Sequence, residues 1–394
     1  MVMRMLLFMA VMTVVWVGGH IYIGRRVFGG LELSRRARRL GWAALAASGS
    51  TAMAALWTSR LGSGIAGMRA LQWVGLWLFG LTSVLFFLVL FSDVVGLAAH
   101  GMRRVVSAAN PVPPDDPSRR GFLGKVASMG AVATSGGVGG VGLAQAVQQP
   151  EVVEVEVPID GLPEAYDGYR IVQLSDVHVG PTIRRDHLRG IVDRANALDA
   201  DLAVVTGDLI DGYVDDLREQ VAPLGELRGR DGAFFVTGNH EYYWDGPAWC
   251  AEVSRLGLTV LNNEHRVLER DGARLLLAGC TDVSAGQHVA SHASDPAAAR
   301  AGAPECDVSL LLAHQPRSID AAAAAGYDLQ LSGHTHGGQY FPFSLLVHLA
   351  QPYVAGLAKH GPTWIYVSRG TGYWGPPMRV GAPHEITLVT LRRA

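Results

Sequence analysis

Three stretches of about twenty residues near the start of the chain contain no Asp, Glu, Lys or Arg, and they are residues 5–24, 40–59 and 70–92. A helix needs roughly 20 apolar residues to cross the hydrocarbon core of a bilayer, so each stretch is long enough to span a membrane. A helix at the surface of a soluble protein carries a polar face, which these stretches lack. The sequence therefore predicts a three-span transmembrane region within residues 1–109.

The charged residues are distributed unevenly along the chain. Residues 1–125 contain 14 Lys and Arg against 4 Asp and Glu, whereas residues 126–394 contain 19 against 31. The basic residues lie between apolar stretches and form no single basic face, so no nucleic-acid partner is expected. Six arginines follow the first stretch and two follow the second, and an excess of Lys and Arg marks a cytoplasmic loop. This pattern predicts an N-terminus outside the cytoplasm. The six arginines are Arg25, Arg26, Arg35, Arg36, Arg38 and Arg39.

A Pro-rich hinge with a pair of arginines follows the third stretch, at residues 110–125. Its end, Ser118-Arg119-Arg120-Gly121-Phe122-Leu123-Gly124-Lys125, resembles a twin-arginine export signal, with the lysine one place later than in the common pattern. Residues 126–150 carry no charge and contain six glycines, so we interpret them as an uncleaved fourth span or signal-like segment. The twin-arginine translocation machinery is then an expected partner. Alternatively, the two arginines are positive-inside residues before an ordinary span. Both interpretations place residues 151–394 outside the cytoplasm at the cell membrane.

From residue 151 onward, short aliphatic stretches alternate with helical patterns, which is typical of an α/β domain. The three cysteines, Cys250, Cys280 and Cys306, lack Cys-x-x-Cys spacing and are expected to be buried thiols. The predicted strands cover residues 152–157, 169–174, 202–206, 233–237, 274–278, 308–313, 328–331, 364–367 and 385–391. The predicted helices cover residues 184–197, 215–227, 247–256 and 317–324.

Polar clusters follow five of the predicted strands. Open α/β sheets bind ligands at the carboxyl ends of their strands, so the five clusters can converge on one cleft. A single Asp at a strand end is usually a turn former, but five coincident clusters predict a site. In chain order they are Ser175-Asp176-Val177-His178, Gly207-Asp208-Leu209-Ile210-Asp211, Gly238-Asn239-His240-Glu241, His314-Gln315-Pro316 and Ser332-Gly333-His334-Thr335-His336.

The residue types in these clusters indicate metal chemistry. Two Asp, one Asn and four His without Cys form a mixed oxygen and imidazole set that suits divalent Mn, Fe, Co or Zn. Seven side chains exceed the need of one ion, and a pair of ions roughly 3.5–4 Å apart that share one carboxylate would use all of them. Gly207, Gly238 and Gly333 precede the ligands and are expected to permit tight turns that aim the side chains inward.

The five clusters, taken in order, resemble the motifs of the calcineurin-like metallophosphoesterase family over about residues 169–345. Within that family the chain is similar to the membrane-associated bacterial YkuE and YaeI groups, whose first motif tolerates a serine such as Ser175. The resemblance implies a four-layer α/β/β/α sandwich over residues 151–394. It also implies a phosphoric ester hydrolase that uses two divalent metal ions and a bridging hydroxide. By matching motif, Asp176, His178 and His336 would hold the first metal, Asn239, His314 and His334 the second, and Asp208 would bridge them.

The resemblance also implies roles for the residues beside the ligands. His240 would stay off the metals and stabilise or protonate the leaving oxygen, so His240 and Asp208 are the predicted catalytic residues. Asp211 and Glu241 would orient the ligands. The sequence contains neither a Gly-x-Ser-x-Gly elbow nor a phosphate-binding Gly-x-x-x-x-Gly-Lys-[Ser/Thr] loop, which disfavours a serine hydrolase and a nucleotide-driven ATPase.

The expected substrate is a phosphoester, and the sequence leaves open which kind of molecule carries it. The apolar segment 337–347 follows His336, and it either receives an acyl chain or packs in the core. The aromatic loop 373–377 either lines the cleft or turns the chain. Anchorage at a bilayer favours a lipid-borne or cell-envelope phosphodiester. The alternatives are a nuclease or nucleotide phosphodiesterase, which would show basic or stacking residues at the cleft rim, and a non-catalytic metal-binding membrane sensor.

Overall fold

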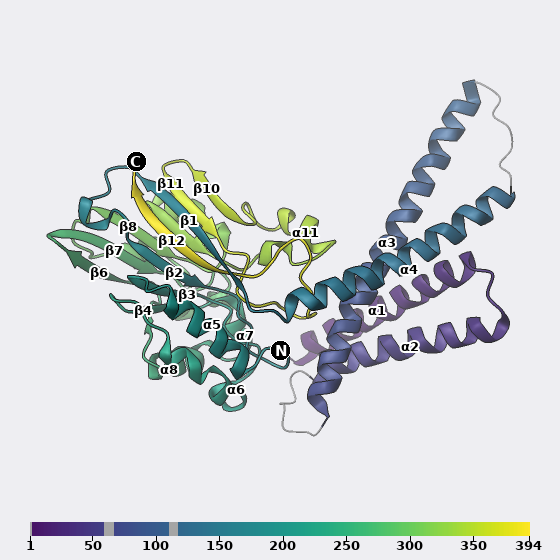
Figure 1. The fold of residues 1–394 in the computed structure, drawn as a ribbon, viewed down its shortest axis with the longest axis horizontal. Coiled ribbons are helices and arrows are strands. Elements are labelled where there is room, and N and C mark those ends of the chain that lie inside the picture. Colours follow the sequence, from purple (N-terminus) through teal and green to yellow (C-terminus); the bar gives the residue numbers. More distant parts are fainter. Residues whose placement is uncertain (1, 59–66, 110–116) are drawn as a thin grey trace. The chain divides into compact units, whose positions relative to one another are not determined.

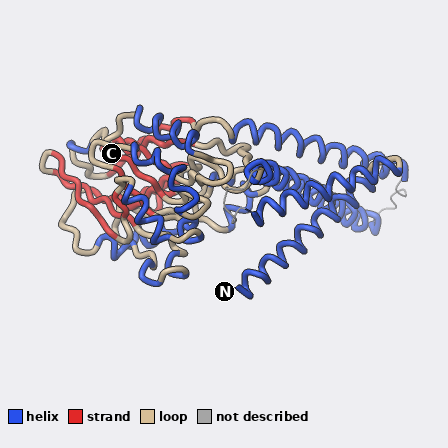
Figure 2. The backbone as a smooth tube through the Cα atoms, turned by 90° about the horizontal axis from the view of Figure 1, so that it is seen from below, coloured by secondary structure: helices blue, strands red, loops and turns tan. Residues whose placement is uncertain are grey.

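A computed structural model describes residues 2–58, 67–109 and 117–394, which form two compact units. The first unit comprises residues 1–144 with residues 376–378, and the second comprises residues 145–375 and 379–394. Figure 2 shows that the described part of the N-terminal region is helical and that the strands lie in the second unit.

Four long helices make up the described part of the N-terminal region. Small residues bring two of them close together, since a Cβ on Gly75 would lie 2.4 Å from the Cβ of Ala55. The indole of Trp77 donates a hydrogen bond of 3.1 Å to the carbonyl oxygen of Gly139. The carboxylate of Asp93 accepts a hydrogen bond of 2.6 Å from the hydroxyl of Tyr22. The helices are α1 (Val2–Gly30), α2 (Arg35–Thr58), α3 (Met68–Ala109) and α4 (Pro117–Ala146).

Within the described residues, two helical segments are long and apolar enough to cross a bilayer, Met68–Val105 in α3 and Gly121–Ala146 in α4. The predicted spans 70–92 and 126–150 overlap these two segments. The other two predicted spans, 5–24 and 40–59, lie mainly in α1 and α2, and their place in a membrane stays a prediction.

The predicted hinge and the twin-arginine-like motif fall partly outside the described residues, because residues 110–116 are not among them. From Pro117 onward the backbone is helical, so the motif belongs to the start of α4. The motif therefore runs into the apolar segment without a break in the helix.

Two six-stranded sheets form the second unit (Figure 1). The first has the order β1-β12-β2-β3-β4-β5, in which β2 to β5 are parallel and β12 is antiparallel to β2. The second has the order β10-β11-β9-β8-β7-β6, in which β11, β9, β8 and β7 are parallel. The strands are β1 (Glu151–Ile159), β2 (Arg170–Leu174), β3 (Leu202–Thr206), β4 (Ala233–Val236), β5 (Thr259–Val260), β6 (Glu264–Arg270), β7 (Ala273–Gly279), β8 (Val308–Leu312), β9 (Leu329–Ser332), β10 (Gly356–His360), β11 (Thr363–Val367) and β12 (Glu385–Arg393).

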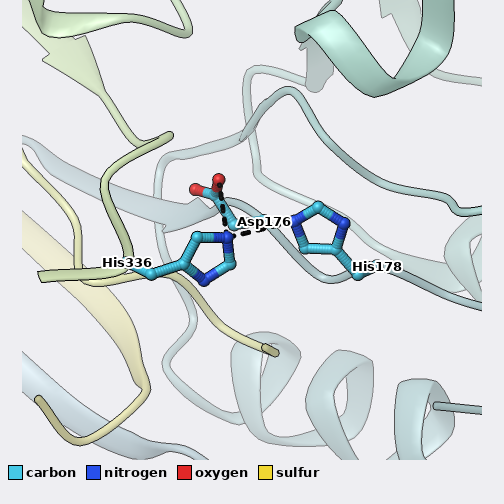
Figure 3. Close-up of side chains that lie close together, drawn as sticks. All are labelled: Asp176, His178 and His336. Atoms are coloured by element: carbon cyan, nitrogen blue, oxygen red, sulfur yellow. Dashed lines mark hydrogen bonds and ion pairs between the residues drawn. The ribbon is translucent and has the colours of Figure 1, made fainter. Parts of the chain in front are cut away.

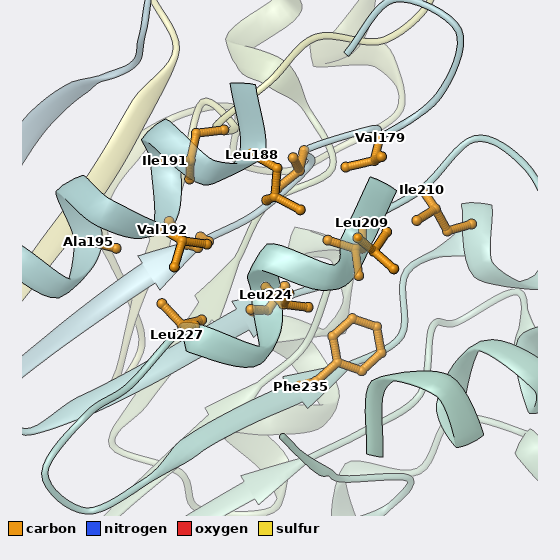
Figure 4. Close-up of a cluster of buried hydrophobic side chains, with 14 of the residues drawn as sticks. Val179, Leu188, Ile191, Val192, Ala195, Leu209, Ile210, Leu224, Leu227 and Phe235 are labelled. Atoms are coloured by element: carbon orange, nitrogen blue, oxygen red, sulfur yellow. The ribbon is translucent and has the colours of Figure 1, made fainter. Parts of the chain in front are cut away.

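Three buried apolar clusters hold the layers together. The largest joins the first sheet to its helices, where Leu188 and Ile191 of α5 pack with Phe235 of β4 (Figure 4). A second cluster fills the space between the two sheets, and a third joins the second sheet to α10. The predicted four-layer α/β/β/α arrangement is thus confirmed. The helices are α5 (Arg185–Ala197), α6 (Val214–Val221), α7 (Asn239–Tyr243), α8 (Gly246–Arg255), α9 (Pro296–Arg300), α10 (Ile319–Ala324) and α11 (Phe343–Leu346).

All nine predicted strands are present, and the three that the sequence did not predict, β5, β6 and β10, lie at sheet edges. An edge strand faces solvent on one side, so it lacks the continuous apolar run that marks a central strand. Cys250 and Cys280 are buried as expected, but the prediction for Cys306 is wrong, because that residue is only half-buried in a loop before β8.

Candidate metal centre

The carboxyl ends of five parallel strands, β2, β3, β4, β8 and β9, meet at one edge of the second unit. Two side chains hold the sheets together there. The amide of Gln173 donates hydrogen bonds to the hydroxyl of Thr206 (2.9 Å) and to the carbonyl oxygen of Ser332 (3.0 Å). The Nδ1 atom of His314 donates to the carbonyl oxygen of Thr206 (2.8 Å). The loops after the five strands are therefore fixed relative to one another.

Asp176, His178 and His336 form the first ligand group (Figure 3). The Nε2 atoms of His178 and His336 face each other at 3.1 Å, and Nε2 of His336 lies 3.5 Å from Oδ1 of Asp176. All three side chains are buried. Three donor atoms that converge at this spacing can bind one cation.

Asp208, His314 and His334 form the second ligand group. The Nδ1 atom of His334 lies 3.2 Å from Nε2 of His314, which in turn lies 3.1 Å from Oδ2 of Asp208. Asn239 begins α7 at the end of β4, and its buried Oδ1 atom has no hydrogen-bond partner. A buried carbonyl oxygen without a partner is costly, and coordination of a cation would satisfy it.

Asp208 connects the two groups. Its Oδ2 atom lies 3.1 Å from His314 and 3.9 Å from Nε2 of His178, while its Oδ1 atom accepts a hydrogen bond of 2.8 Å from the backbone of His240. Burial alone would raise the pKa of Asp208, but His314 and His240 outweigh burial and hold the pKa well below its usual range. The carboxylate is therefore charged, which would suit it to hold a cation.

The donor set fits divalent cations. Two pairs of imidazole nitrogens face each other within 3.2 Å, and a cation between them would take up lone pairs that otherwise compete for one proton. Six of the seven predicted ligands belong to the two groups, and Asn239 supplies the unpartnered oxygen. Carboxylate, amide and imidazole ligands without thiolate suit Mn, Fe, Co or Zn.

His240 forms a third candidate ligand group with His178 and Asp208, and Asp211 holds its ring. The Nδ1 atom of His240 contacts Oδ1 of Asp211, and its Nε2 atom lies 3.9 Å from Oδ2 of Asp208. The same Asp211 carboxylate lies 3.2 Å from Nδ1 of His178. Asp211 therefore orients one predicted ligand and the predicted proton donor together.

Glu241 fixes the turn that carries Asp208. Its carboxylate accepts hydrogen bonds from the backbone amides of Asp208 (3.0 Å), Leu209 (2.8 Å) and Gly238 (2.6 Å). Burial, assisted by the charge of Asp208, raises the pKa of Glu241 to about 7. The loops after β3 and β4 are thus held as one unit.

Five of the predicted ligands have left-handed backbone conformations. Non-glycine residues rarely adopt positive φ, and such strain concentrates at functional sites. Only Gly207 among the three preceding glycines has a positive φ, of 88°. Gly238 and Gly333 are needed for space instead, since a Cβ there would lie 2.2 Å from a carboxylate oxygen of Asp208 or Asp176. The five ligands are Asp176, His178, Asp208, His334 and His336.

Comparison with known proteins identifies the family. Residues 169–338 match the calcineurin-like phosphoesterase family. An uncharacterized metallophosphoesterase of Helicobacter pylori is 35% identical over 316 residues, which cover 80% of this chain and 82% of that protein. The chain belongs to the calcineurin-like phosphoesterase family.

Two further relatives extend this result. The Bacillus subtilis protein YkuE, an uncharacterized metallophosphoesterase, is 32% identical over 297 residues, covering 70% of this chain and 98% of YkuE. A transmembrane protein with metallophosphoesterase domain from Danio rerio is 41% identical over 261 residues, covering 64% of this chain. The matched region spans 60% of that protein and of its Bos taurus counterpart.

Arg379 is a buried residue of this calcineurin-like site that the sequence did not reveal. Its guanidinium donates to the carbonyl oxygens of His336 (2.8 Å), Arg369 (2.8 Å) and Ala382 (3.1 Å). The same group lies 3.0 Å from Nδ1 of His336 and also contacts the carbonyl oxygen of Gly372. Burial lowers its pKa to about 9, so Arg379 remains a cation at neutral pH. It joins the loop of one predicted ligand to the loop before β12.

We expect Arg379→Met to weaken metal binding by about 10- to 100-fold, because the partners that orient a ligand matter at that scale. The substitution leaves several buried carbonyl oxygens unsatisfied and removes the donor at His336. Isothermal titration of Mn²⁺ into the purified full-length variant measures the effect. Equal affinity in the variant and the parent protein would contradict a positioning role for Arg379.

Two aromatic side chains stand at the rim beside His240. The ring of Trp374 lies 5.6 Å from the His240 ring and is 53% exposed, and the ring of Tyr243 lies 5.0 Å away and is 45% exposed. The tryptophan of the loop 373–377 therefore lies beside His240, and the lining of a cleft by this loop stays a prediction.

Proposed function

We propose that this protein is a membrane-anchored, metal-dependent phosphoesterase that hydrolyses a phosphodiester outside the cytoplasm. The observation that carries the proposal is the pair of neighbouring ligand groups at the edge where the two sheets meet, with Asp208 of the second group 3.9 Å from His178 of the first. Two divalent cations bound there would neutralise charge on the phosphoryl oxygens and activate the attacking water.

The chain's own residues supply positioning and a proton. Burial lowers the pKa of His240, but Asp208 and Asp211 outweigh burial and raise it to about 9. His240 therefore holds a proton on Nε2 at neutral pH, while Nδ1 is fixed by Asp211. In the proposed reaction this proton passes from Nε2 to the leaving oxygen of the substrate, which makes the departing group neutral.

Two carriers of the phosphodiester are candidates. The apolar segments of α3 and α4 and the transmembrane relatives support a lipid-borne or cell-envelope substrate. Trp374 and Tyr243, exposed beside His240, support a nucleotide instead, because exposed aromatic rings stack on bases. Exposed aromatic rings can pack against many kinds of substrate, so they discriminate weakly between the two. Membrane anchorage limits which substrates the enzyme can meet, so we favour the lipid-borne or envelope phosphodiester.

An activity screen tests the proposal. Full-length protein loaded with Mn²⁺ is expected to hydrolyse bis-p-nitrophenyl phosphate, and His240→Gln is expected to lower kcat by about 10²- to 10⁴-fold, the usual contribution of a proton donor. Phospholipids and cyclic nucleotides, assayed in parallel, separate the two carriers. Metal binding without hydrolysis of any of these esters would favour a membrane sensor over an enzyme.

The membrane topology is a separate part of the proposal. Arginines concentrate between the first two apolar stretches, which predicts a C-terminal domain outside the cytoplasm. Alkaline phosphatase, which folds only after export, is expected to be active when fused after Ala394. An inactive phosphatase fusion would place the domain inside the cell.

A further inference from the structure

An exposed apolar segment, residues 343–349, follows the loop that carries His334 and His336. It comprises α11 and the 3-10 turn η7 (Val347–Leu349), and four of its large apolar side chains point into solvent. Leu345 is 63% exposed and Leu349 is 85% exposed. Residues 151–394 are all described, and nine of their large apolar side chains are exposed, so nearly half of these lie in seven consecutive residues. Of the predicted segment 337–347, the first part is thus buried at Gln339 and Tyr340, whereas the part from Phe343 onward is not packed in the core.

The exposed apolar segment is anchored firmly at its start. Tyr340 is buried, and its carbonyl oxygen accepts a hydrogen bond of 3.2 Å from the backbone of Ser344. A Cβ on Gly338 would lie 2.3 Å from the Cα of Ser344, so the segment packs directly on the turn that carries His336.

The residues that follow the exposed apolar segment are anchored as well. The hydroxyl of Thr335 donates a hydrogen bond of 2.6 Å to the carbonyl oxygen of Val354, which closes the loop. Gln351 accepts from the backbone of Arg317 (3.1 Å) and donates to the side chain of Gln315 (3.1 Å). The exposure of residues 343–349 is thus a feature of a closed, tethered loop.

The topology of the second unit places the start of β1 at the edge that carries the site. Strand β1 pairs in parallel with β12, with Glu151 opposite Glu385, and β12 is antiparallel to β2. Strand β1 therefore starts at the same sheet edge where β2 ends and the ligands begin. The backbone of Glu385 bonds to Gly370, whose Cβ position lies 3.0 Å from Asp176. The chain enters the domain at the edge that carries the site.

Only four residues, 147–150, separate this entry point from the end of α4, whose last 26 residues are apolar enough to cross a bilayer. Such a connection reaches less than about 20 Å even when fully extended. A membrane-embedded α4 would therefore keep the site edge close to the lipid surface. The exposed apolar segment contains no Asp, Glu, Lys or Arg. Apolar side chains without charge are those that enter the boundary between headgroups and acyl chains.

We propose that residues 343–349 insert into the bilayer interface and present the site to phosphodiesters carried by membrane lipids. This inference rests on the proposed phosphoesterase function and names its substrate class. The occupant of the apolar face is the lipid surface itself, which places a headgroup phosphate beside the loop of His336.

Two phosphodiesters with one leaving group test the inference on full-length protein in phosphatidylcholine nanodiscs. Hexadecyl p-nitrophenyl phosphate enters the bilayer, whereas ethyl p-nitrophenyl phosphate stays in water. The protein is expected to prefer the hexadecyl ester by about tenfold or more in kcat/KM, because insertion brings the segment and the ester into the same layer. Leu345→Glu with Leu349→Glu is expected to remove this preference and to leave hydrolysis of the ethyl ester within about twofold, since neither residue is in the metal centre.

A matched variant controls for added charge. Ala297→Glu with Ala298→Glu places two carboxylates at exposed positions in the first turn of α9, where a helix tolerates acids, and it is expected to retain the preference. Equal kcat/KM for the two esters in the parent protein, or a preference that survives in the Leu345 and Leu349 variant, would overturn the inference. Failure of the metal-loaded parent to hydrolyse the ethyl ester would instead overturn the proposed function.

A spin label reports the location of the segment without reference to activity. Leu349→Cys is labelled with a nitroxide in a Cys306→Ser background, since Cys250 and Cys280 are buried. The label is expected to be more accessible to oxygen than to a water-soluble nickel chelate, and a label at Ala297→Cys is expected to show the reverse. Access of the chelate to the label at residue 349 would overturn insertion. Dipolar broadening between two labels would show a second copy of the chain on this face, which would also overturn it.

Discussion

Asp208→Asn is expected to lower phosphoesterase kcat/KM by about 10³-fold or more, since metal-based stabilisation supplies several kcal/mol and each 1.36 kcal/mol is a factor of ten. The substitution keeps the size of the side chain and the Oδ1 acceptor for the backbone of His240. It replaces the oxygen that faces His314 at 3.1 Å and His178 at 3.9 Å with an amide nitrogen, which has no lone pair for a cation. Both ligand groups lose their shared charge, so metal analysis of the purified variant is expected to show a lower content than in the parent protein.

Asp201→Asn is the matched control, because Asp201 precedes β3 and Asp208 follows the same strand. Asp201 is buried and pairs with Arg270 at 3.0 Å, far from the ligand edge of the sheet. We expect it to change stability slightly and to leave kcat/KM and metal content as they were. Near-parent activity in Asp208→Asn would refute the assignment of this residue as the shared ligand.

Removal of metal is expected to lower the Tm of the domain by about 10 °C. A ligand present at about a thousand times its Kd stabilises the native state by about 4 kcal/mol, and each kcal/mol shifts the Tm of a domain of this size by about 2–4 °C. The physical cause is that the ligand side chains, among them Asp176 and Asp208, are brought together only in the native state, so a bound cation stabilises that state alone. Calorimetry of the full-length protein before and after chelation, and again after addition of Mn²⁺, measures the shift.

The Asp208→Asn variant serves as the control for this measurement as well. Its Tm is expected to respond to chelation and to Mn²⁺ by a few degrees at most, because its ligand groups are incomplete. If the Tm of the parent protein changed neither on chelation nor on addition of Mn²⁺, no stabilising cation would be bound at the ligand edge of the sheets.

Local sequence was sufficient to predict the main layers and the ligand clusters. Each cluster directly follows a short apolar run, and such runs form buried strands whose ends are fixed by the sheet. Asp176 after β2 and His314 after β8 are therefore placed by their strands, although 138 positions separate them in the chain. Such a pattern can be recognised from the sequence because the strand and the loop that follows it are neighbours along the chain.

The parts that escaped prediction depend on contacts between distant segments. Arg379 lies 43 positions after His336 in an irregular loop, and its burial is set only when the loops of β9 and β12 pack together. Edge strand β6 alternates half-buried and exposed residues, so it carries too little apolar character to be recognised. The left-handed backbone of Asp176 or His334 likewise depends on the surrounding hydrogen bonds, since Asp and His adopt it more often than other residues but only at a minority of positions.

The position of β12 has a consequence for biosynthesis. Strand β12 lies between β1 and β2 in the first sheet, and the loop before it carries Arg379 and borders Asp176. The first sheet therefore cannot close until residues 385–393 have been synthesised, although the strands that carry the predicted ligands are made earlier. The ligand loops can reach their final positions only after that step, so metal binding that depends on those loops is expected to follow it.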